Sequence, residues 1–232
     1  MLGIIGGMGP LADVTFFKLL HYNTLSESDS GYVPVLYDGN CLRPDRSSFL
    51  TEKSRLSPFE SLRFSLKLLE RNGADVIVMP CNTAHFWFNR LYRTKKRKTR
   101  LISIVHEVCA ACQRKDLRRV CVLSTAGTRK KDIYGDCAFK MGIDLIYPEK
   151  ELCQKISELI KRIKKGENAT LSELEPHLKQ LDCDGFILAC TELSVALDRT
   201  REPSFTYIDS LSALVGASLN ACGVRHKPIP FT

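Results

Sequence analysis

The sequence lacks any uninterrupted apolar stretch of the roughly 18–20 residues that a membrane-spanning helix needs. Its start, MLGIIGGMGP, has no basic residue and too short an apolar run for a secretory signal. Glycine and proline are scarce, at 14 and 10 of 232 residues, which excludes collagen-like and low-complexity proteins. We therefore expect a protein of the cytoplasm with no membrane partner.

The composition is that of a folded protein. Apolar residues make up 44% of the chain and charged residues 26%, so there is enough apolar side chain to offset the conformational entropy lost on folding. The length is compatible with one large domain or two small ones. Lys and Arg outnumber Asp and Glu by 34 to 26, a net charge of +8. That excess suits anionic small substrates, weak nucleic-acid contact or simply a solvated surface.

The ten cysteines do not indicate a disulfide scaffold, because that class consists of short secreted chains. We expect reduced thiols, several of them buried as small apolar side chains. Cys109 and Cys112, with His106 nearby, could suggest zinc, but no second cysteine pair stands at ligand spacing. Positions three apart share one face of a helix, so buried packing is the favoured interpretation.

Short apolar runs alternate with longer amphipathic segments along the chain. The short runs are rich in Val, Ile and Leu and are bounded by Gly, Pro, Asp or Ser, which predicts strands. Several are apolar at consecutive positions, which indicates parallel strands buried on both faces. The alternation predicts an α/β fold with mainly parallel sheets. The predicted strands are Leu2–Ile5, Val33–Tyr37, Asp75–Met79, Leu101–Ser103, Arg119–Leu123, Asp144–Ile146, Asp184–Ala189 and Phe205–Ile208; the predicted helices are Leu11–Asn23, Pro58–Arg71, Ala84–Arg93, Arg129–Met141, Lys150–Lys165, Leu171–Leu181 and Ser210–Cys222.

Part of the sequence is repeated. Residues 75–83 (DVIVMPCNT) and 184–192 (DGFILACTE) each have an acidic residue, an apolar strand and then a cysteine followed by polar residues. The repeat predicts two similar α/β domains, each with a mainly parallel sheet flanked by helices. We assign residues 1–98 plus 210–232 to the first domain and residues 99–209 to the second.

The repeated cysteines, Cys81 and Cys190, come directly after predicted strands. Ligands of open α/β sheets bind just beyond the carboxyl ends of strands. A thiol at the start of a following helix would meet free N–H groups and the positive end of the helix dipole, which favour the thiolate. Two thiols on facing domains suit the inversion of a stereocentre, which needs a base on one face and an acid on the other. The alternative is that both are core cysteines.

Five motifs, in order and at compatible spacing, carry a family resemblance. The chain resembles the aspartate/glutamate racemase family, and its aspartate racemase branch most closely, from Met1 to about Ala221. The motifs are Gly6-Gly-Met-Gly-Pro10, Pro44-Asp45-Arg46, Met79-Pro-Cys-Asn-Thr-Ala-His85, Ser124-Thr-Ala-Gly-Thr128 and Cys190-Thr-Glu-Leu-Ser194.

The resemblance implies an amino-acid racemase that uses no cofactor, neither pyridoxal phosphate nor a metal, and that often forms a homodimer. It also implies that the two domains are pseudo-symmetric and that the active site lies in the cleft between them. It implies that Cys81 and Cys190 are catalytic and that the substrate is a small amino dicarboxylate, aspartate or also glutamate. Arg46 and Lys164 resemble the family's anchors for the side-chain carboxylate. The remaining residues implied to bind substrate are Met8, Asn82, Thr83, Thr125, Thr191 and Glu192.

Other interpretations stay open. Glu192 stands where glutamate racemases of wall synthesis tend to have His, whereas Cys81 is kept where some relatives have Thr. A related cysteine enzyme, such as a hydantoin racemase, maleate isomerase or arylmalonate decarboxylase, remains an alternative, as does a catalytically dead binding protein. We expect His85 to shape the site, and the basic run 94–100 to be a solvated loop rather than a nucleic-acid site.

Overall fold

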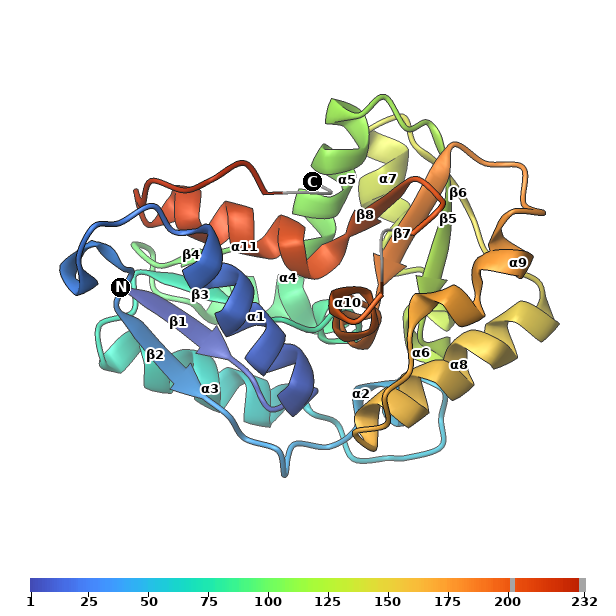
Figure 1. Cartoon of the computed structure of the whole chain (residues 1–232). Coiled ribbons are helices and arrows are strands. Elements are labelled where there is room, and N and C mark those ends of the chain that lie inside the picture. The colour runs from blue at the N-terminus through green and yellow to red at the C-terminus, as the bar shows by residue number, and fades with distance from the viewer. Residues whose placement is uncertain (201–202, 230–232) are drawn as a thin grey trace.

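The computed structural model describes residues 1–200 and 203–229. Two four-stranded sheets, each with parallel strands throughout, lie side by side with helices around them (Figure 1). The strand order is β2-β1-β3-β4 in the first sheet and β6-β5-β7-β8 in the second. The predicted α/β class with parallel sheets is confirmed. The strands are β1 (Leu2–Ile5), β2 (Val35–Asp38), β3 (Val76–Val78), β4 (Arg100–Leu101), β5 (Arg119–Ser124), β6 (Asp144–Ile146), β7 (Gly185–Ala189) and β8 (Tyr207–Asp209).

The two sheets have the same connectivity. β1 lies between β2 and β3, and β5 lies between β6 and β7, so β3 and β7 occupy equivalent places. Every residue of β1, β3 and β7 is buried, as their consecutive apolar positions predict. The cysteine motifs that follow β3 and β7 therefore lie at the carboxyl ends of equivalent strands in two similar sheets. The first sheet reaches Leu101 through β4, just beyond the boundary predicted at residue 98.

Most of the predicted helices are present. The capping box of Thr170 and Glu173 forms, and Gly73 takes a positive φ of 93° directly after α3. The helices of the described residues are α1 (Pro10–Asn23), α2 (Arg46–Leu50), α3 (Phe59–Arg71), α4 (Phe88–Thr94), α5 (Ile104–Arg114), α6 (Ala126–Lys130), α7 (Gly135–Lys140), α8 (Lys150–Lys164), α9 (Glu175–Leu178), α10 (Thr191–Asp198) and α11 (Ser210–Ala221), with short 3-10 turns η1 (Asp29–Gly31), η2 (Thr83–Trp87) and η3 (Leu171–Glu173).

Two predicted helices are wrong as continuous elements. Segment 129–141 breaks between α6 and α7, where Asp132 has a positive φ of 43°. Gly135 stands inside this segment and weakens a continuous helix there. Segment 171–181 divides into η3 and the four-residue α9, because Pro176 has no N–H to extend a helical hydrogen-bond ladder. Three helices, α2, α5 and α10, lie outside the segments predicted to be helical.

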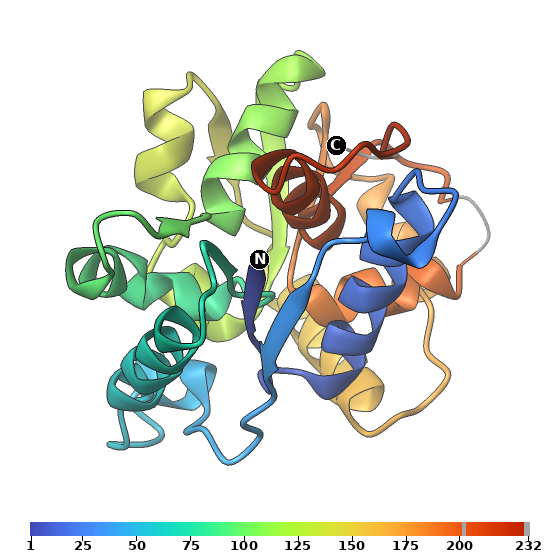
Figure 2. The same cartoon turned by 90° about the vertical axis from the view of Figure 1, so that its left-hand side faces the viewer.

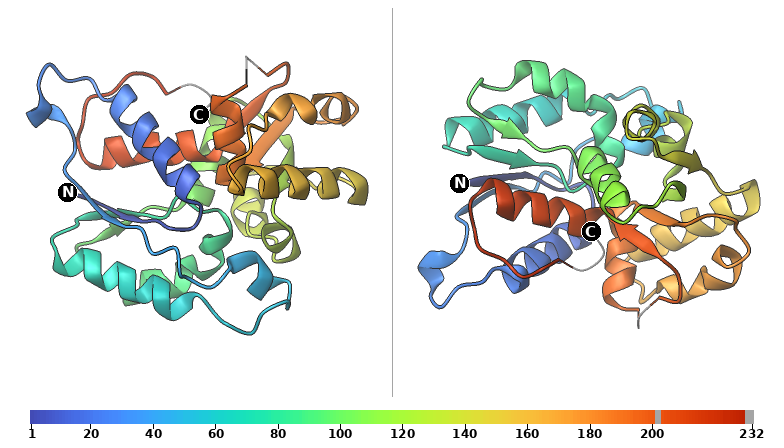
Figure 3. Two further views of the ribbon diagram at one scale, coloured as in Figure 1. Left: turned by 60° about the horizontal axis from the view of Figure 1, so that its bottom comes forward. Right: turned by 90° about the horizontal axis from the view of Figure 1, so that it is seen from above.

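A shared core joins the two halves. One apolar cluster contains Leu2 and Val78 of the first sheet, Val120 and Ile187 of the second, and Leu214 of α11. Helix α11 packs against α1 and α5 at this junction (Figures 2 and 3). Two further clusters cover the outer faces, one beneath α3 and one beneath α8 and α10. Since burial of apolar side chains fixes the sheets against each other, the ends of β3 and β7 hold a defined relative position. The membership of α11 in the first domain remains a prediction.

Other features of the sequence are accounted for within the described residues. Cys109 and Cys112 are buried in the shared core, and no group of three side chains there is arranged to hold a metal ion. The basic run 94–100 is a surface loop whose Lys96 N–H donates to the buried Glu70 carboxylate. In residues 1–200 and 203–229, no helix is both long enough and apolar enough to span a membrane.

The turn after β1 requires glycine. Gly7 has a φ of +73°, and a Cβ there would lie 2.4 Å from the carbonyl carbon of Asn40. The Gly7 N–H donates to Asp13 Oδ2 at 2.7 Å, and the Tyr37 hydroxyl donates to the same oxygen at 2.8 Å. This hydrogen-bond network holds the turn that places Met8 beyond the end of the strand.

We expect Gly7→Ala to lower the free energy of unfolding by about 3 kcal/mol, because backbone strain of about 1–2 kcal/mol adds to the clash with Asn40. Gly73→Ala is the matched control. Gly73 also has a positive φ, but a Cβ added there would meet nothing within 4 Å, so the expected loss is about 1 kcal/mol. Urea denaturation measures both. Equal losses would show that the clash with Asn40 contributes nothing.

Candidate active site

A pocket lies beyond the carboxyl ends of the two sheets and is lined by residues of α2, α8 and α10, among others. Figure 1 shows where these three helices lie in the fold. It encloses about 300 Å³ of space, its opening included. All ten residues singled out from the sequence line it, together with two that were not. The lining residues are Met8, Asp45, Arg46, Ser47, Cys81, Asn82, Thr83, Thr125, Lys164, Cys190, Thr191 and Glu192.

Cys81 lies in the turn between β3 and η2 and is 6% exposed. His85 of η2 holds Cys81 in place, because its Nδ1 donates a hydrogen bond to the Cys81 carbonyl oxygen at 2.9 Å. The other ring nitrogen, Nε2, accepts the Ile104 N–H at 3.0 Å. These two bonds require the neutral ring with its proton on Nδ1. Burial lowers the pKa of His85 to about 4. His85 therefore ties the Cys81 turn to the start of α5, in keeping with its expected shaping role.

Cys190 caps the N-terminus of α10 and has a charged neighbour. Its thiol donates to Glu192 Oε2 at 2.9 Å, and Lys164 Nζ lies 3.6 Å from Glu192 Oε1. Burial, followed by the Glu192 charge, raises the pKa of the Cys190 thiol well above its ordinary value. Cys190 therefore keeps its proton at neutral pH.

Lys164, at the end of α8, is the charged partner of this pair. Burial pulls the pKa of the Lys164 ammonium down, but its acidic neighbours, the Glu192 carboxylate first, outweigh that effect and leave the pKa above its ordinary value. Lys164 is therefore positively charged at neutral pH. Its side chain is 40% exposed, so it stands at the mouth of the pocket rather than on its floor.

Arg46 is a second cation in the lining and the first residue of α2, which Asp45 caps by accepting the Ser48 N–H at 2.6 Å. Its guanidinium donates to the carbonyl oxygens of Met8 at 2.9 Å and Pro44 at 3.3 Å, and its buried Nε makes no hydrogen bond. Both acceptors are uncharged, so its hydrogen bonds leave the positive charge uncompensated. A guanidinium in this state suits a carboxylate ligand.

Threonine hydroxyls bridge the two halves across the pocket. Thr83 Oγ1 lies 2.9 Å from Thr125 Oγ1 and 3.0 Å from Thr128 Oγ1. On the other side, the Thr191 hydroxyl donates to the Pro80 carbonyl at 3.3 Å. These contacts fix the pocket-lining residues of the two halves relative to each other.

Both polar atoms of the Asn82 side-chain amide make hydrogen bonds. Its Nδ2 donates to Ser210 Oγ at 2.9 Å, and its Oδ1 accepts the hydroxyl of the fully buried Tyr134. A contact between Asn82 and a ligand would therefore use the backbone rather than the side chain.

Sequence reasoning missed four residues at or beside the pocket. Asp45 and Ser47 line it; Asp45 belongs to a quoted motif, whereas Ser47, which accepts the Gly127 N–H at 3.0 Å, gives no signal of its own. Asp13 and Arg43 are buried charged residues near the pocket. Burial of a charged residue depends on the folded surroundings, and a single sequence contains no pattern that reveals it.

Comparisons with known proteins show which family and which fold this chain resembles. The model of the Asp/Glu/Hydantoin racemase family matches residues 5–217. The structure of Picrophilus torridus aspartate racemase is similar at 29% identity and a TM-score of 0.82, covering 97% of this chain and 95% of that one. A broad specificity amino-acid racemase of Bacillus subtilis, RacX, is 25% identical over 95% of this chain and 97% of its own length. Glutamate racemase from Campylobacter jejuni shares the fold, with a TM-score of 0.63 at 17% identity over 97% and 87% of the two chains.

The buried neutral His85 predicts a stability loss in acid. Its pKa falls from 6.5 in the unfolded chain to about 4 in the folded one, so the unfolded state binds the proton first as the pH drops. Stability is fully present above pH 6.5 and declines towards pH 4, by about 3 kcal/mol for this group. His85→Gln keeps a donor but cannot titrate.

Urea denaturation of both proteins from pH 7 to pH 4 isolates this contribution. We expect the wild-type protein to lose more stability than His85→Gln across that range. Parallel pH profiles would contradict the neutral, anchoring state of His85.

Proposed function

Because the chain belongs to the Asp/Glu/Hydantoin racemase family, we propose that it is a racemase of a small amino dicarboxylate, with aspartate as the first candidate substrate and glutamate as the second. The observation that carries the proposal is that Cys81 and Cys190, which follow equivalent strands of two similar sheets, line one pocket. A two-base inversion needs two proton-transferring groups of this kind around one carbon.

The proposed reaction is a proton transfer at the α-carbon without a cofactor. One cysteine, as thiolate, removes the α-proton, and the other, as thiol, protonates the opposite face. The hydrogen bond from Cys190 to Glu192 supports the thiol role for Cys190 in the resting site. Cys81 would then be the first base, and the two would exchange roles when the product enantiomer is the substrate.

The α-carbanion formed in between needs stabilisation, because water stabilises a carbanion of this kind poorly. Backbone N–H groups at the N-terminus of α10, beside Cys190, are fixed donors for the α-carboxylate. Donors held in place before the reaction stabilise developing charge without the cost of reorienting solvent. The small, buried pocket adds to this effect by excluding water.

Selection of a dicarboxylate rests on the two cations of the lining. Arg46 has no carboxylate among its hydrogen-bond partners and can hold the distal carboxylate, while Lys164 lies at the mouth. The small size of the pocket and these two cations support a small amino dicarboxylate over an aromatic or neutral amino acid. That the protein forms a homodimer remains a prediction, and so does its location in the cytoplasm.

In the first test, the protein is incubated with a panel of L-amino acids in deuterated water. Mass spectrometry measures the α-deuterium gained, and chiral chromatography measures the enantiomeric ratio. We expect exchange and racemisation together with aspartate, weaker turnover with glutamate, and none with neutral amino acids. Cys81→Ala and Cys190→Ala should each reduce racemisation by about 10²–10⁴-fold, the usual contribution of a proton-transfer group. Cys41→Ala, at an exposed thiol, is the control and should match the wild-type protein.

Absence of exchange with every dicarboxylate at high enzyme concentration would overturn the proposal. Full activity of either Cys81→Ala or Cys190→Ala would overturn the two-base mechanism while leaving a racemase possible.

A second prediction concerns Arg46. Arg46→Lys keeps the charge but removes the planar pair of donors, so we expect KM for the dicarboxylate to rise about tenfold or more. Arg118→Lys makes the same replacement at a site 76% exposed and should change nothing. Steady-state kinetics measures both variants. An unchanged KM in Arg46→Lys would show that Arg46 does not hold the substrate carboxylate.

A further inference from the structure

Three of the ten cysteines gather at the packing of α5 against α7, two helices that lie side by side in Figure 1. Cys109 and Cys112 of α5 are buried in the shared core, and Cys137 of α7 packs against that core and is partly exposed. These three are not among the described residues that line the candidate active site. The proposed reaction therefore gives them no role.

Cys109 and Cys137 are in direct contact. Their thiols form a hydrogen bond across the two helices, and this bond is the largest influence on the ionisation of both. The bond, followed by burial, raises the pKa of Cys109, whereas the same bond lowers the pKa of Cys137 below its ordinary value. The Cys109 thiol is therefore the donor, and the Cys137 sulfur accepts.

Cys137 is the member of the pair that solvent reaches. It lines a hollow formed by residues of α4, α5 and α7, among others, which encloses about 1200 Å³ of space, its opening included. His106 and Lys140 line the same hollow and add to the lowering of the Cys137 pKa, while burial and Asp136 oppose it. Oxidants react with accessible thiolates first. Since Cys109 has no exposed surface, an oxidant meets Cys137 before it meets Cys109.

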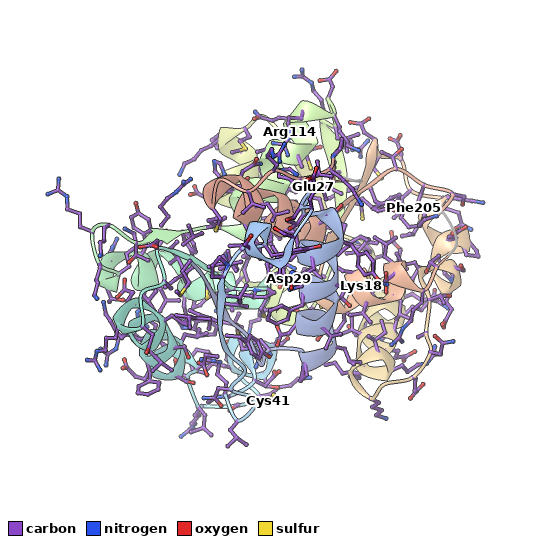
Figure 4. All side chains as sticks on the ribbon, turned by 60° about the vertical axis from the view of Figure 1, so that its left-hand side comes forward. Lys18, Glu27, Asp29, Cys41, Arg114 and Phe205 are labelled. Atoms are coloured by element: carbon purple, nitrogen blue, oxygen red, sulfur yellow. The ribbon has the colours of Figure 1, made fainter. Side chains whose placement is uncertain are left out.

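Neither Cys112 nor Cys41 is placed to replace a member of this pair. Cys112 shares a face of α5 with Cys109, but Cβ atoms three positions apart on a helix are about 5–6 Å apart, beyond the about 3.5–4.5 Å of a disulfide. The exposed Cys41 lies on a loop at the opposite end of the molecule from Arg114, the last residue of α5 (Figure 4). Cys109 and Cys137, already in contact, are thus suited to bond to each other.

We propose that Cys137 and Cys109 form a site of reversible oxidation by peroxide, which links α7 to α5 through a disulfide. The Cys137 thiolate attacks hydrogen peroxide, the O–O bond breaks, and hydroxide leaves a sulfenic acid on Cys137. The Cys109 sulfur then attacks the Cys137 sulfur, the S–O bond breaks, and the hydroxyl leaves as water with the Cys109 proton. Two thiols are oxidised, and one peroxide is reduced to two waters. A thiol reductant reverses the change.

This site goes beyond the proposed function and does not depend on it. Disulfides inside cells are usually transient and responsive to oxidants, which fits a pair that is reduced at rest and in contact. A bond between residues 109 and 137 closes a long loop of chain, so it should stabilise the folded protein by restricting the unfolded one.

The test treats the reduced full-length Cys41→Ser protein with hydrogen peroxide, since removing the exposed thiol prevents links between molecules. Remaining thiols are blocked with iodoacetamide, and unreduced peptides are mapped by mass spectrometry. We expect the peptides of Cys109 and Cys137 to be joined, and dithiothreitol to separate them. Cys222→Ser in the same background, at another partly exposed thiol, is the matched control and should leave the link in place.

Two further variants test the order of the steps. In Cys109→Ser, a sulfenic acid should accumulate on Cys137, where dimedone traps it. In Cys137→Ser, the buried Cys109 should stay unmodified. The linked protein should unfold at a urea midpoint about 1 M higher than the reduced protein, whereas peroxide-treated Cys137→Ser should show no rise.

Peroxide treatment that links Cys81 to Cys190 alone, or that produces no link between Cys109 and Cys137, would overturn the proposal. A linked protein with an unchanged or lower urea midpoint would overturn it too, because the native contact would then not accommodate the bond. None of these measurements needs turnover. A protein that fails to racemise can still form the link, and an active racemase without the link would refute this site alone.

Discussion

The hydrogen bond from the Cys190 thiol to the Glu192 carboxylate makes two otherwise equivalent cysteines unequal. Both cysteines follow equivalent strands and both are buried in one pocket. Two identical thiols would have no reason to differ in charge, and a proton transfer from one face to the other needs one base and one acid. Glu192 supplies that difference, and Lys164 in turn compensates the carboxylate. The chemistry we propose depends on this short chain of charges.

The fold serves to keep this arrangement in place. The shared core beneath α1, α5 and α11 fixes the two sheets against each other, so that the ends of β3 and β7 meet at one pocket. Around the pocket, Thr83, Asn82 and Thr191 make hydrogen bonds across the two halves, Asn82 with Tyr134. Several of these side chains therefore have a structural task, which leaves Arg46, Lys164 and the backbone N–H groups as the groups suited to hold a ligand.

Much of this could be predicted from the sequence. The strands were visible because parallel strands buried on both faces need consecutive apolar residues, and the repeated cysteine motif pointed to one pocket at two strand ends. Helices were harder to predict, because the left-handed backbone at Asp132 and the missing N–H of Pro176 interrupt segments whose apolar spacing alone looks continuous. Short helix α2 has too few turns to show a period. Its position follows from tertiary contacts with α6, which no local pattern contains.

The electrostatics of the site lay beyond the sequence for a different reason. Arg43 and Arg46 are two residues of one type in the same loop, yet one faces the pocket and the other lies under the glycine turn. The pairing of Glu192 with Cys190 likewise depends on the turn of α10 that brings residues two apart into contact. Such differences arise from the path of the backbone and from burial, which only the folded structure contains.

The central claim is that two thiols exchange protons with one carbon from opposite faces. The distribution of α-deuterium between the two enantiomers after the first turnovers tests this claim most directly. L-aspartate is incubated in deuterated water, and the reaction is stopped when only a small fraction has inverted. The account predicts that the D-aspartate formed contains one deuterium at the α-carbon, while the remaining L-aspartate contains almost none. Equal labelling of both enantiomers at that early time would mean that one group removes and returns the proton, and would contradict the account.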